Sequence, residues 1–409
     1  MKRAQLLKLF VASAGLGLII GMTTDLFIRA IRFGSHVLLS NWTVGTAGRA
    51  WAVVGLSAAA GLAMGMCVKF FGTNDDGIGF DAVLAAVKQD GGLGLAQIKR
   101  IVLNTYPGLV TGASIGPESP LVTIAGYCGN LFAKLLKASR QQLMAFITIA
   151  LGGGIGVLVD SPVAGPILFA EQPPTVDKSA NLMLVFTSMI AASIGFAVYK
   201  FLGAPLLTGD KLVPAYGGLQ AIHLLYGLAV GLLGTAFGLF FKFLILFVRR
   251  SLRRFAHHPI SKGLGVGLVV GVCGAIAPLV MFDGSAQLAS LVDNASKYSL
   301  LALLGLALLR LISTSTALGG GYQGGNIFPS IFMSGALGLA VHAMLPFIPA
   351  PVAMVSFMAS VMYVFTPLPL FCIFLFTEIS SFTLIPVMAM ALVSGYLLNI
   401  ILKTLRHQP

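Results

Sequence analysis

The chain has 409 residues, of which 57% are hydrophobic and only 10% are charged, and its formal net charge is +13. Soluble domains carry about 25% charged residues, so this composition excludes an ordinary soluble protein. The basic residues cluster near the N-terminus, at Lys2, Arg3 and Lys8, and in the segment 249–262. Such clusters mark the cytoplasmic side of a membrane protein. We therefore predict that both regions are cytoplasmic, and we expect no nucleic-acid partner.

Apolar runs follow one another along almost the whole chain. The longest cover residues 9–28, 52–71, 182–201, 222–248 and 384–402. Each of them approaches or exceeds the ~20 residues that a helix needs to cross a bilayer. Other apolar runs are shorter and are broken by Gly and Pro, which predicts helices that cross only part of the bilayer. We predict an all-α, multi-pass integral protein of the cell membrane, surrounded by lipid.

The chain repeats several of its patterns in the same order. The spacing between the two copies is nearly constant, and we expect two halves, residues 1–207 and 215–409, joined by a polar connection at 208–214 with no separate cytoplasmic domain. Halves with matching interruptions are typical of transporters built from repeats, although the patterns leave parallel and inverted repeats open. The matching pairs are Asp76-Gly77 with Asp283-Gly284, Gly116 and Pro120 with Gly325 and Pro329, and Pro162–Glu171 with Pro369–Glu378.

Three helices are predicted to begin inside the apolar part of the chain, near residues 76–79, 116–120 and 325–329. Glycine followed by proline ends one helix and starts another. The first N–H groups of such a helix lack partners and carry a partial positive charge, which suits a small anion. The candidate anion-binding residues are Asp76, Gly77, Ile78, Gly79, Gly116, Pro117, Ser119, Pro120, Gly325, Asn326, Ile327, Phe328 and Pro329.

Glu118 lies at one of these helix starts and is one of only three glutamates, with Glu171 and Glu378. An ionised side chain in such surroundings costs roughly 2.5–3.5 kcal/mol on insertion scales, which makes it a candidate functional residue. One interpretation is a gate: the ionised carboxylate competes with an anion for the N–H groups and opens the site when it is protonated or moves aside. The alternative is a carboxylate that caps its own helix.

No pattern in the sequence indicates an enzyme or a bound cofactor. The four cysteines and six histidines show no metal-ligand spacing, and the glycine runs 152–154 and 319–321 lack the Lys-Ser/Thr of a phosphate loop. No Gly-x-Ser-x-Gly nucleophile motif is present. We therefore expect a protein that is not an enzyme and holds no metal or cofactor.

Three motifs resemble those of the CLC family of chloride channels and proton/chloride antiporters. They are Gly116-Pro117-Glu118-Ser119-Pro120, the glycine-rich approach to Gly325-Asn326-Ile327-Phe328-Pro329, and Ser161–Gln172. The resemblance spans roughly residues 50–390, and the Gly-Pro-Glu-x-Pro form is similar to a divergent bacterial branch of ion-transport proteins. It implies a homodimer with one pore in each subunit. Each subunit would contain two inverted repeats of tilted, broken and re-entrant helices and would transport chloride or a similar small anion past a gate at Glu118.

The chain departs from the family pattern at several positions. Asp76 replaces the serine of the first anion motif and could act as a helix N-cap or as a second gate. Gln172 replaces the inner proton-transfer glutamate. Glu171, one position earlier, either takes over proton transfer or is a structural acid like Glu378. Tyr396, in the final apolar run, is a possible pore tyrosine that no motif matches to the family; it could cap the site from the cytoplasmic side, but we favour a position at an interface. The sequence thus leaves both a proton exchanger and a passive channel open.

A second class of function remains beside anion transport. Asp76, Glu118 and Glu171 could serve as ligands of a cation- or proton-coupled carrier. A non-transporting membrane scaffold is a third hypothesis, but it leaves the repeated helix breakers without a purpose. Flux driven by a gradient of one anion, with impermeant cations, would separate the two transport hypotheses.

Overall fold

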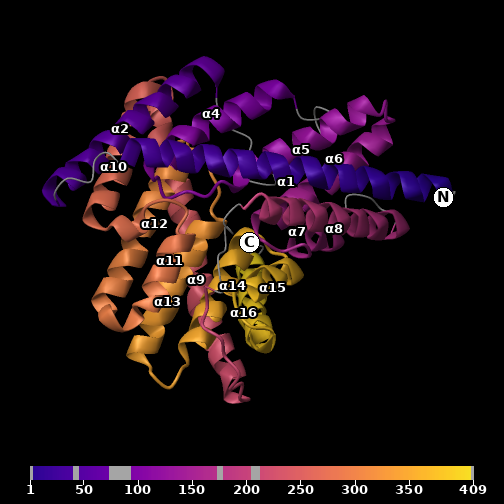
Figure 1. Cartoon of the computed structure of the whole chain (residues 1–409). Helices are drawn as coiled ribbons and strands as arrows, with labels where there is room; N and C mark the ends of the chain where they lie inside the picture. The colour runs from indigo at the N-terminus through magenta and orange to yellow at the C-terminus, as the bar shows by residue number, and fades with distance from the viewer. Residues whose placement is uncertain (1–2, 40–45, 73–93, 173–177, 204–211, 407–409) are drawn as a thin grey trace.

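The computed structural model describes residues 3–39, 46–72, 94–172, 178–203 and 212–406 (Figure 1). Within these residues the regular structure is helical, apart from one isolated bridge between two glycines. The α-helices are α1 (Arg3–Leu39), α2 (Thr46–Phe71), α4 (Leu95–Thr111), α5 (Glu118–Leu135), α6 (Arg140–Leu158), α7 (Ala164–Glu171), α8 (Lys178–Phe201), α9 (Ile222–Leu252), α10 (Pro259–Ile276), α11 (Ser285–Asp293), α12 (Leu300–Gly320), α13 (Ile327–Met344), α14 (Ala350–Phe365), α15 (Pro369–Glu378) and α16 (Ile385–Arg406).

The helices fall into two length classes, as the broken apolar runs predict. Eight of the described helices are long and apolar enough to cross a membrane. By contrast, α7 has 8 residues, α11 has 9 and α15 has 10, so none of these three reaches across a hydrocarbon core of about 30 Å at 1.5 Å per residue. The protein is therefore a multi-pass membrane protein in which full-length helices alternate with helices that cross only part of the bilayer.

The two halves of the chain use the same order of helices. The 18-residue α5 of the first half corresponds to the 18-residue α13 of the second, and the short α7 corresponds to the short α15. The packing repeats as well, since α6 contacts α1, α5 and α8 as α14 contacts α9, α13 and α16. This is the inverted-repeat fold that the resemblance implied. Residues 208–211 of the expected connection lie outside the described residues, so the boundaries 1–207 and 215–409 stay a prediction.

The halves meet along α2 and α10, which lie side by side in Figure 1. Their contact depends on glycine, because a Cβ on Gly61 would collide with the carbonyl oxygen of Gly263, and a Cβ on Gly263 would collide with that of Gly61. Small residues of this kind let membrane helices approach until their backbones touch. The glycine-rich composition thus serves close helix packing between the two halves.

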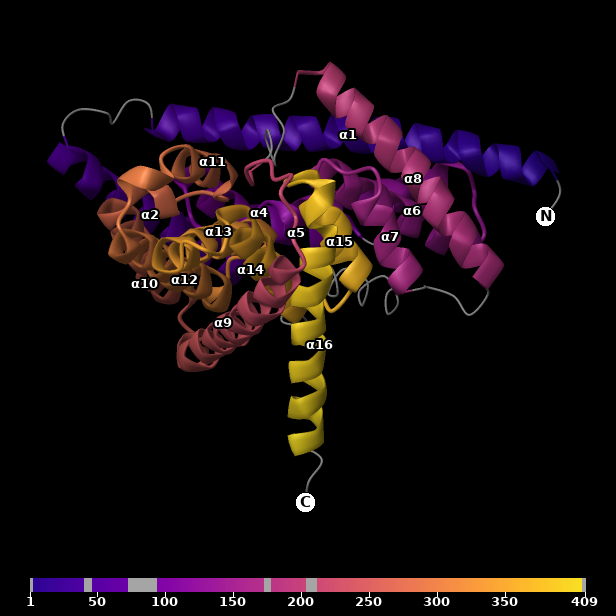
Figure 2. The same ribbon diagram turned by 90° about the horizontal axis from the view of Figure 1, so that it is seen from below.

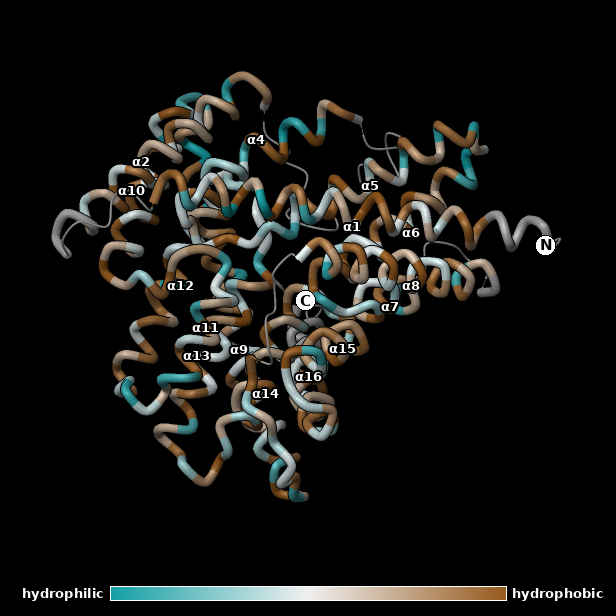
Figure 3. Tube along the Cα trace, viewed as in Figure 1, coloured by the Kyte–Doolittle hydropathy of each residue, from teal (hydrophilic) through white to brown (hydrophobic). Residues whose placement is uncertain are grey.

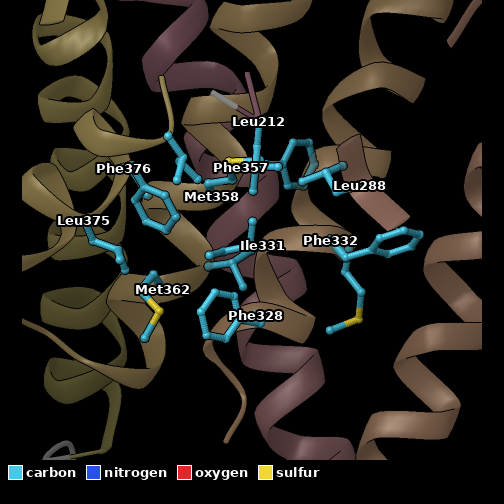
Figure 4. Packing of buried hydrophobic residues seen from close by; sticks show 14 of the residues in the cluster. Leu212, Leu288, Phe328, Ile331, Phe332, Phe357, Met358, Met362, Leu375 and Phe376 are labelled. Carbon is cyan, nitrogen blue, oxygen red and sulfur yellow. The ribbon is translucent and has the colours of Figure 1, made fainter. Parts of the chain in front are cut away.

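Hydrophobic residues cover most of the length of the helices, and hydrophilic residues gather mainly near the connections (Figure 3). The largest buried cluster includes most of α13 and α14. In Figure 4 the α13 residues Phe328 and Ile331 lie toward side chains of α14 and α15, whereas Phe332 extends to the opposite side of the helix. The beginning of α13 therefore lies in the interior of the protein, where the candidate site is found.

Candidate functional site

Two of the three predicted helix starts come together in the structure. Helix α5 begins at Glu118 and α13 begins at Ile327, each within its Gly-x-x-x-Pro motif. The glycines that open the two motifs form an antiparallel bridge. The Gly116 N–H donates to the Gly325 carbonyl oxygen at 3.0 Å, and the Gly325 N–H donates to the Gly116 oxygen at 2.8 Å. Equivalent residues of the two halves thus face each other, and both helix N-termini point into one site.

The Glu118 side chain crosses from the first half to the second. Its Oε1 accepts a hydrogen bond of 3.0 Å from the backbone N–H of Phe328, in the first turn of α13. The N–H groups of Glu118 itself and of Ile327 also interact with the carboxylate. The side chain is only 5% exposed. The carboxylate therefore engages N–H donors from both helix starts. The sequence predicted either a gate or a cap on its own helix, and neither prediction included the contact with α13.

Gly116 and Gly325 are needed to hold this carboxylate. A Cβ on either glycine would coincide with the carboxyl group of Glu118. Neither glycine has a positive φ angle, so the requirement is for space and not for an unusual backbone conformation. The two glycines form a slot whose size fits a carboxylate or a small anion.

One oxygen of the carboxylate is left without a partner. Glu118 Oε2 is buried and accepts no hydrogen bond from the described residues. A buried acceptor of this kind loses its hydrogen bonds to water and gains none in return, which costs free energy in this side-chain position. The closed arrangement is therefore held by a small number of contacts, and an anion with more suitable geometry could compete for the same donors.

The other residues of the two motifs shape the helix starts. Pro117 is the N-cap residue of α5, and Ser119 and Pro120 are buried in its first turn. Asn326 is the N-cap residue of α13, and its carbonyl oxygen accepts hydrogen bonds from the N–H and the hydroxyl of Ser330. Phe328 and Pro329, in the first turn of α13, are buried as well. The third predicted start, Asp76 to Gly79, lies outside the described residues.

Glu171 and Glu378 cap the helices of the opposite half. The two carboxylate oxygens of Glu171, at the end of α7, accept hydrogen bonds of 2.8 Å from the N–H groups of Leu370 and Phe371 in the first turn of α15. Glu378, at the end of α15, accepts a hydrogen bond of 3.0 Å from the hydroxyl of Ser161. That hydroxyl accepts one from Ala164 at the start of α7. Figure 2 shows α7 and α15 next to each other, and these reciprocal caps join their ends.

Replacing Glu171 by alanine removes both acceptors from the start of α15. A lost N-cap costs about 0.5–2 kcal/mol, and we expect a decrease of about 1–2 °C in the melting temperature of the detergent-solubilised protein. Glu171→Gln keeps one oxygen acceptor and should lose less. If both variants melt like the parent, the capping role of Glu171 is contradicted.

Two further candidates lie apart from the buried carboxylate. Gln172 is exposed and follows directly after α7. Tyr396 is 58% exposed on α16, so the structure does not bring this tyrosine to Glu118. Among the described residues no group of histidine, cysteine and acidic side chains could hold a metal ion.

Sequence reasoning missed two charged residues near the site. Arg310 is fully buried in α12, and Asp283 precedes α11 and interacts electrostatically with Glu118. The signal for Arg310 was available, because it interrupts the apolar run 300–312 and a charge inside a span is a candidate functional residue. In the sequence, Asp283 stands out only as the repeat partner of Asp76.

A repeat-built membrane protein with two helix N-termini meeting at a buried carboxylate is of the transport class. The chain belongs to the voltage gated chloride channel family, whose model matches residues 60–399. This family conducts anions across membranes, so the chain is an ion-transport protein. The family favours an anion pathway over the cation-coupled carrier considered from the sequence.

Curated relatives and solved structures agree with this assignment. "Putative ion-transport protein YfeO" of Shigella flexneri is 26% identical over 313 residues, which cover 74% of this chain and 72% of the relative. The protein of the same name from Escherichia fergusonii is 27% identical over 301 residues, covering 71% and 69% of the two chains.

Two solved structures share the fold at low sequence identity. A slow cyanobacterial Cl⁻/H⁺ antiporter superposes with a TM-score of 0.80 at 17% identity, covering 98% of both chains. A CLC-type fluoride/proton antiporter superposes with a TM-score of 0.78 at 18% identity, covering 97% of this chain and 96% of that one. At such identities the likeness establishes the fold alone.

Proposed function

We propose that the protein moves chloride or a similar small anion across the cell membrane through a site that Glu118 closes. The observation that carries this proposal is the hydrogen bond from the Phe328 N–H to Glu118 Oε1. Through it, a negative group of the first half occupies the N-terminus of a helix in the second half. A helix N-terminus favours negative charge and offers N–H donors, so an anion can replace the carboxylate there.

Transport then follows from competition for the same donors. When the Glu118 side chain leaves the slot between Gly116 and Gly325, the N–H groups of Ile327 and Phe328 lose their acceptor. Unsatisfied donors in an apolar interior are costly, and an anion that enters satisfies them. Because these donors carry only partial charges, the anion is held without a full positive charge in direct contact and can leave again.

Proton counter-movement is the second part of the proposal. Glu118 competes with the anion only while it is ionised, so protonation of the carboxylate and entry of the anion favour each other. Both oxygens of Glu171 accept hydrogen bonds at the start of α15, which supports a structural role for this residue. The proposal therefore assigns the proton step to Glu118 and a structural role to Glu171.

The assembly and orientation complete the proposal. We propose a homodimer with one pathway in each subunit, as the resemblance to the family implies, with the N-terminus and the segment 249–262 on the cytoplasmic side. The positive charge of that segment supports this orientation. Chemical labelling of single cysteines introduced at each position, on intact cells and on inverted vesicles, tests the orientation.

Flux measurements on reconstituted protein test the proposed function. Vesicles containing the full chain would be loaded with chloride, fluoride or nitrate and an impermeant cation, with internal pH recorded in parallel. We expect efflux of at least one of these anions above that of protein-free vesicles, and proton uptake against its gradient if exchange operates. Cation flux without anion flux would contradict the proposal and support the cation-coupled carrier.

A further inference from the structure

Arg310 is a buried charge that the proposed mechanism does not use. Its side chain is 0% exposed, in the middle of α12. Among the described residues, the guanidinium donates to backbone carbonyl oxygens of the segment before α11. Nη1 donates to Leu279 and Met281 at 3.4 Å, and Nη2 donates to Phe282 at 2.8 Å and to Asp283. Nε has no partner among the described residues.

Among the described residues, the guanidinium is hydrogen-bonded to backbone oxygens and not to a carboxylate. Within this part of the chain its positive charge is therefore solvated but not neutralised by contact. Carbonyl oxygens are dipoles and leave the net charge of the guanidinium in place. A buried charge is expensive unless it is paired, and charges inside membrane segments are typically functional. The structure thus keeps a net positive charge in the interior of the second half.

This charge lies beside the helix that forms the candidate site. The guanidinium stacks on the ring of Phe332, with 4.6 Å between its central carbon and the ring centroid. Phe332 follows Phe328 by one helical turn on α13, or about 6 Å along the axis. Figure 4 shows the two phenylalanines on this helix. The Phe328 N–H is the donor that binds Glu118, so Arg310 flanks the same end of α13.

A negative charge stands on the other side of this arrangement. Asp283 Oδ1 accepts hydrogen bonds from the N–H and the hydroxyl of Ser285, at 2.9 and 3.0 Å, which fixes the carboxylate at the start of α11. The carboxylate interacts electrostatically with both Glu118 and Arg310. Asp283 is partly exposed, whereas Arg310 is enclosed. Asp283 thus acts electrostatically on Glu118 and on Arg310, while Arg310 lies against α13 through the ring of Phe332.

We propose that Arg310 and Asp283 together set the electrostatic potential at the Glu118 site and so determine how tightly an anion is held there. Arg310 strengthens anion binding, and Asp283 weakens it so that the anion can leave. Coulomb interactions of this kind act over several ångströms and are little screened in a protein interior. The inference rests on the proposed function, because it assumes that an anion enters this site.

The sequence matches this pair only in part with the first half. Asp283 has a repeat partner in Asp76, whereas the residues 207 to 209 positions before Arg310 are the apolar Ile101, Val102 and Leu103. At these positions of the first half, the arginine has no charged equivalent.

Two substitutions with opposite expected effects test the proposal. Chloride affinity would be measured by titration calorimetry on the purified full chain carrying Glu118→Gln, in which the competing carboxylate charge is absent. Adding Arg310→Met removes the positive charge at similar side-chain length and should weaken chloride binding about tenfold, or about 1.4 kcal/mol. Adding Asp283→Asn keeps an Oδ1 acceptor for Ser285 and should strengthen binding about threefold, roughly half of that free energy.

Matched controls separate charge from packing. Arg29→Met makes the same chemical change at an exposed arginine of α1, whose Nε bonds to Asp25 at 2.8 Å, and should leave chloride affinity unchanged. Arg310→Lys keeps the positive charge but not the planar donors and should fall between the parent and Arg310→Met. Gel filtration and thermal melting report whether each variant is folded. If Arg310→Met does not fold, Asp283→Asn and Arg310→Lys still carry the test.

The outcomes are distinct. Opposite shifts for Arg310→Met and Asp283→Asn support the proposal, since a purely structural role would weaken binding in both. Unchanged affinities in both, or a decrease in both, overturn it. A parent that binds no chloride, fluoride or nitrate and shows no anion flux contradicts the proposed function and this inference with it. A parent that transports anions while the variants bind them equally well overturns this inference alone.

Discussion

Glu118→Gln is expected to raise anion flux through reconstituted protein about tenfold at neutral pH and to abolish its dependence on pH. A hydrogen bond from the Phe328 N–H to an ionised acceptor contributes about 1.5–3 kcal/mol, whereas one to a neutral acceptor contributes about 0.5–1.5 kcal/mol. The difference of roughly 1.4 kcal/mol corresponds to a tenfold weaker hold of the side chain on the site. The anion then meets a weaker competitor.

The direction in which anion flux changes with pH follows from the charge of Glu118. In the parent protein, lowering the pH protonates Glu118 and removes its competing charge, so anion flux should increase as the pH falls. Glutamine does not titrate. The anion flux of the variant should therefore stay constant within about a factor of two between about pH 4 and pH 8. Flux would be followed with a chloride electrode in vesicles buffered at a series of pH values.

Glu378→Gln is the matched control for this substitution. It makes the same change at the end of α15, and its remaining amide oxygen can still accept the hydrogen bond from Ser161. We expect parental flux and parental pH dependence. A Glu118→Gln protein that behaves like the parent in both respects would remove Glu118 from the mechanism.

Gly325→Ala is expected to fill the slot that the Glu118 carboxylate and the anion share. Its Cβ would occupy the position of the Glu118 carboxyl group. The Glu118 side chain must then leave the slot, because the other side of the slot is the backbone of Gly116. The N–H and the carbonyl oxygen of Gly116 are both hydrogen-bonded to residue 325, so this backbone is held in place. We expect flux to fall about tenfold and to respond more weakly to pH, because the methyl group blocks the slot for the anion as well as for the carboxylate. The measurement is the same flux assay.

The glycine prediction has two controls. Gly305→Ala places the same methyl group on α12 where nothing lies within 4 Å, and it should leave flux unchanged. In the double variant Gly325→Ala with Glu118→Gln, flux should stay as low as in Gly325→Ala, because the methyl group blocks the slot whichever side chain stands at position 118. Parental or raised flux in Gly325→Ala would show that the slot is not on the anion pathway.

The charge pair and the gate make different demands on the same site. Glu118 decides when the donors of α13 are free, whereas Arg310 and Asp283 decide how strongly an anion is held once they are. These functions can be separated, since Glu118→Gln should change the pH dependence and Arg310→Met should change the affinity. A carrier needs both properties, because an anion bound too tightly would not be released.

The sequence by itself determined the class of protein and the places where helices begin. Composition and run length are properties of the chain alone, and they predicted a multi-pass helical membrane protein. The starts of α5 and α13 were likewise predictable, because glycine and proline act on the backbone within a few residues. The repeat was visible for the same reason, since matching breakers recur at a fixed spacing in the sequence.

Only the tertiary structure decided which group each acid contacts. Glu118 binds the N–H of Phe328, 210 residues away, and Glu171 binds Leu370 and Phe371, 199 and 200 residues away. A local pattern can offer a carboxylate a cap on its own helix, but it cannot tell which distant helix N-terminus the fold brings nearer. The bridge between Gly116 and Gly325 makes that choice, and it forms only when the two halves pack against each other.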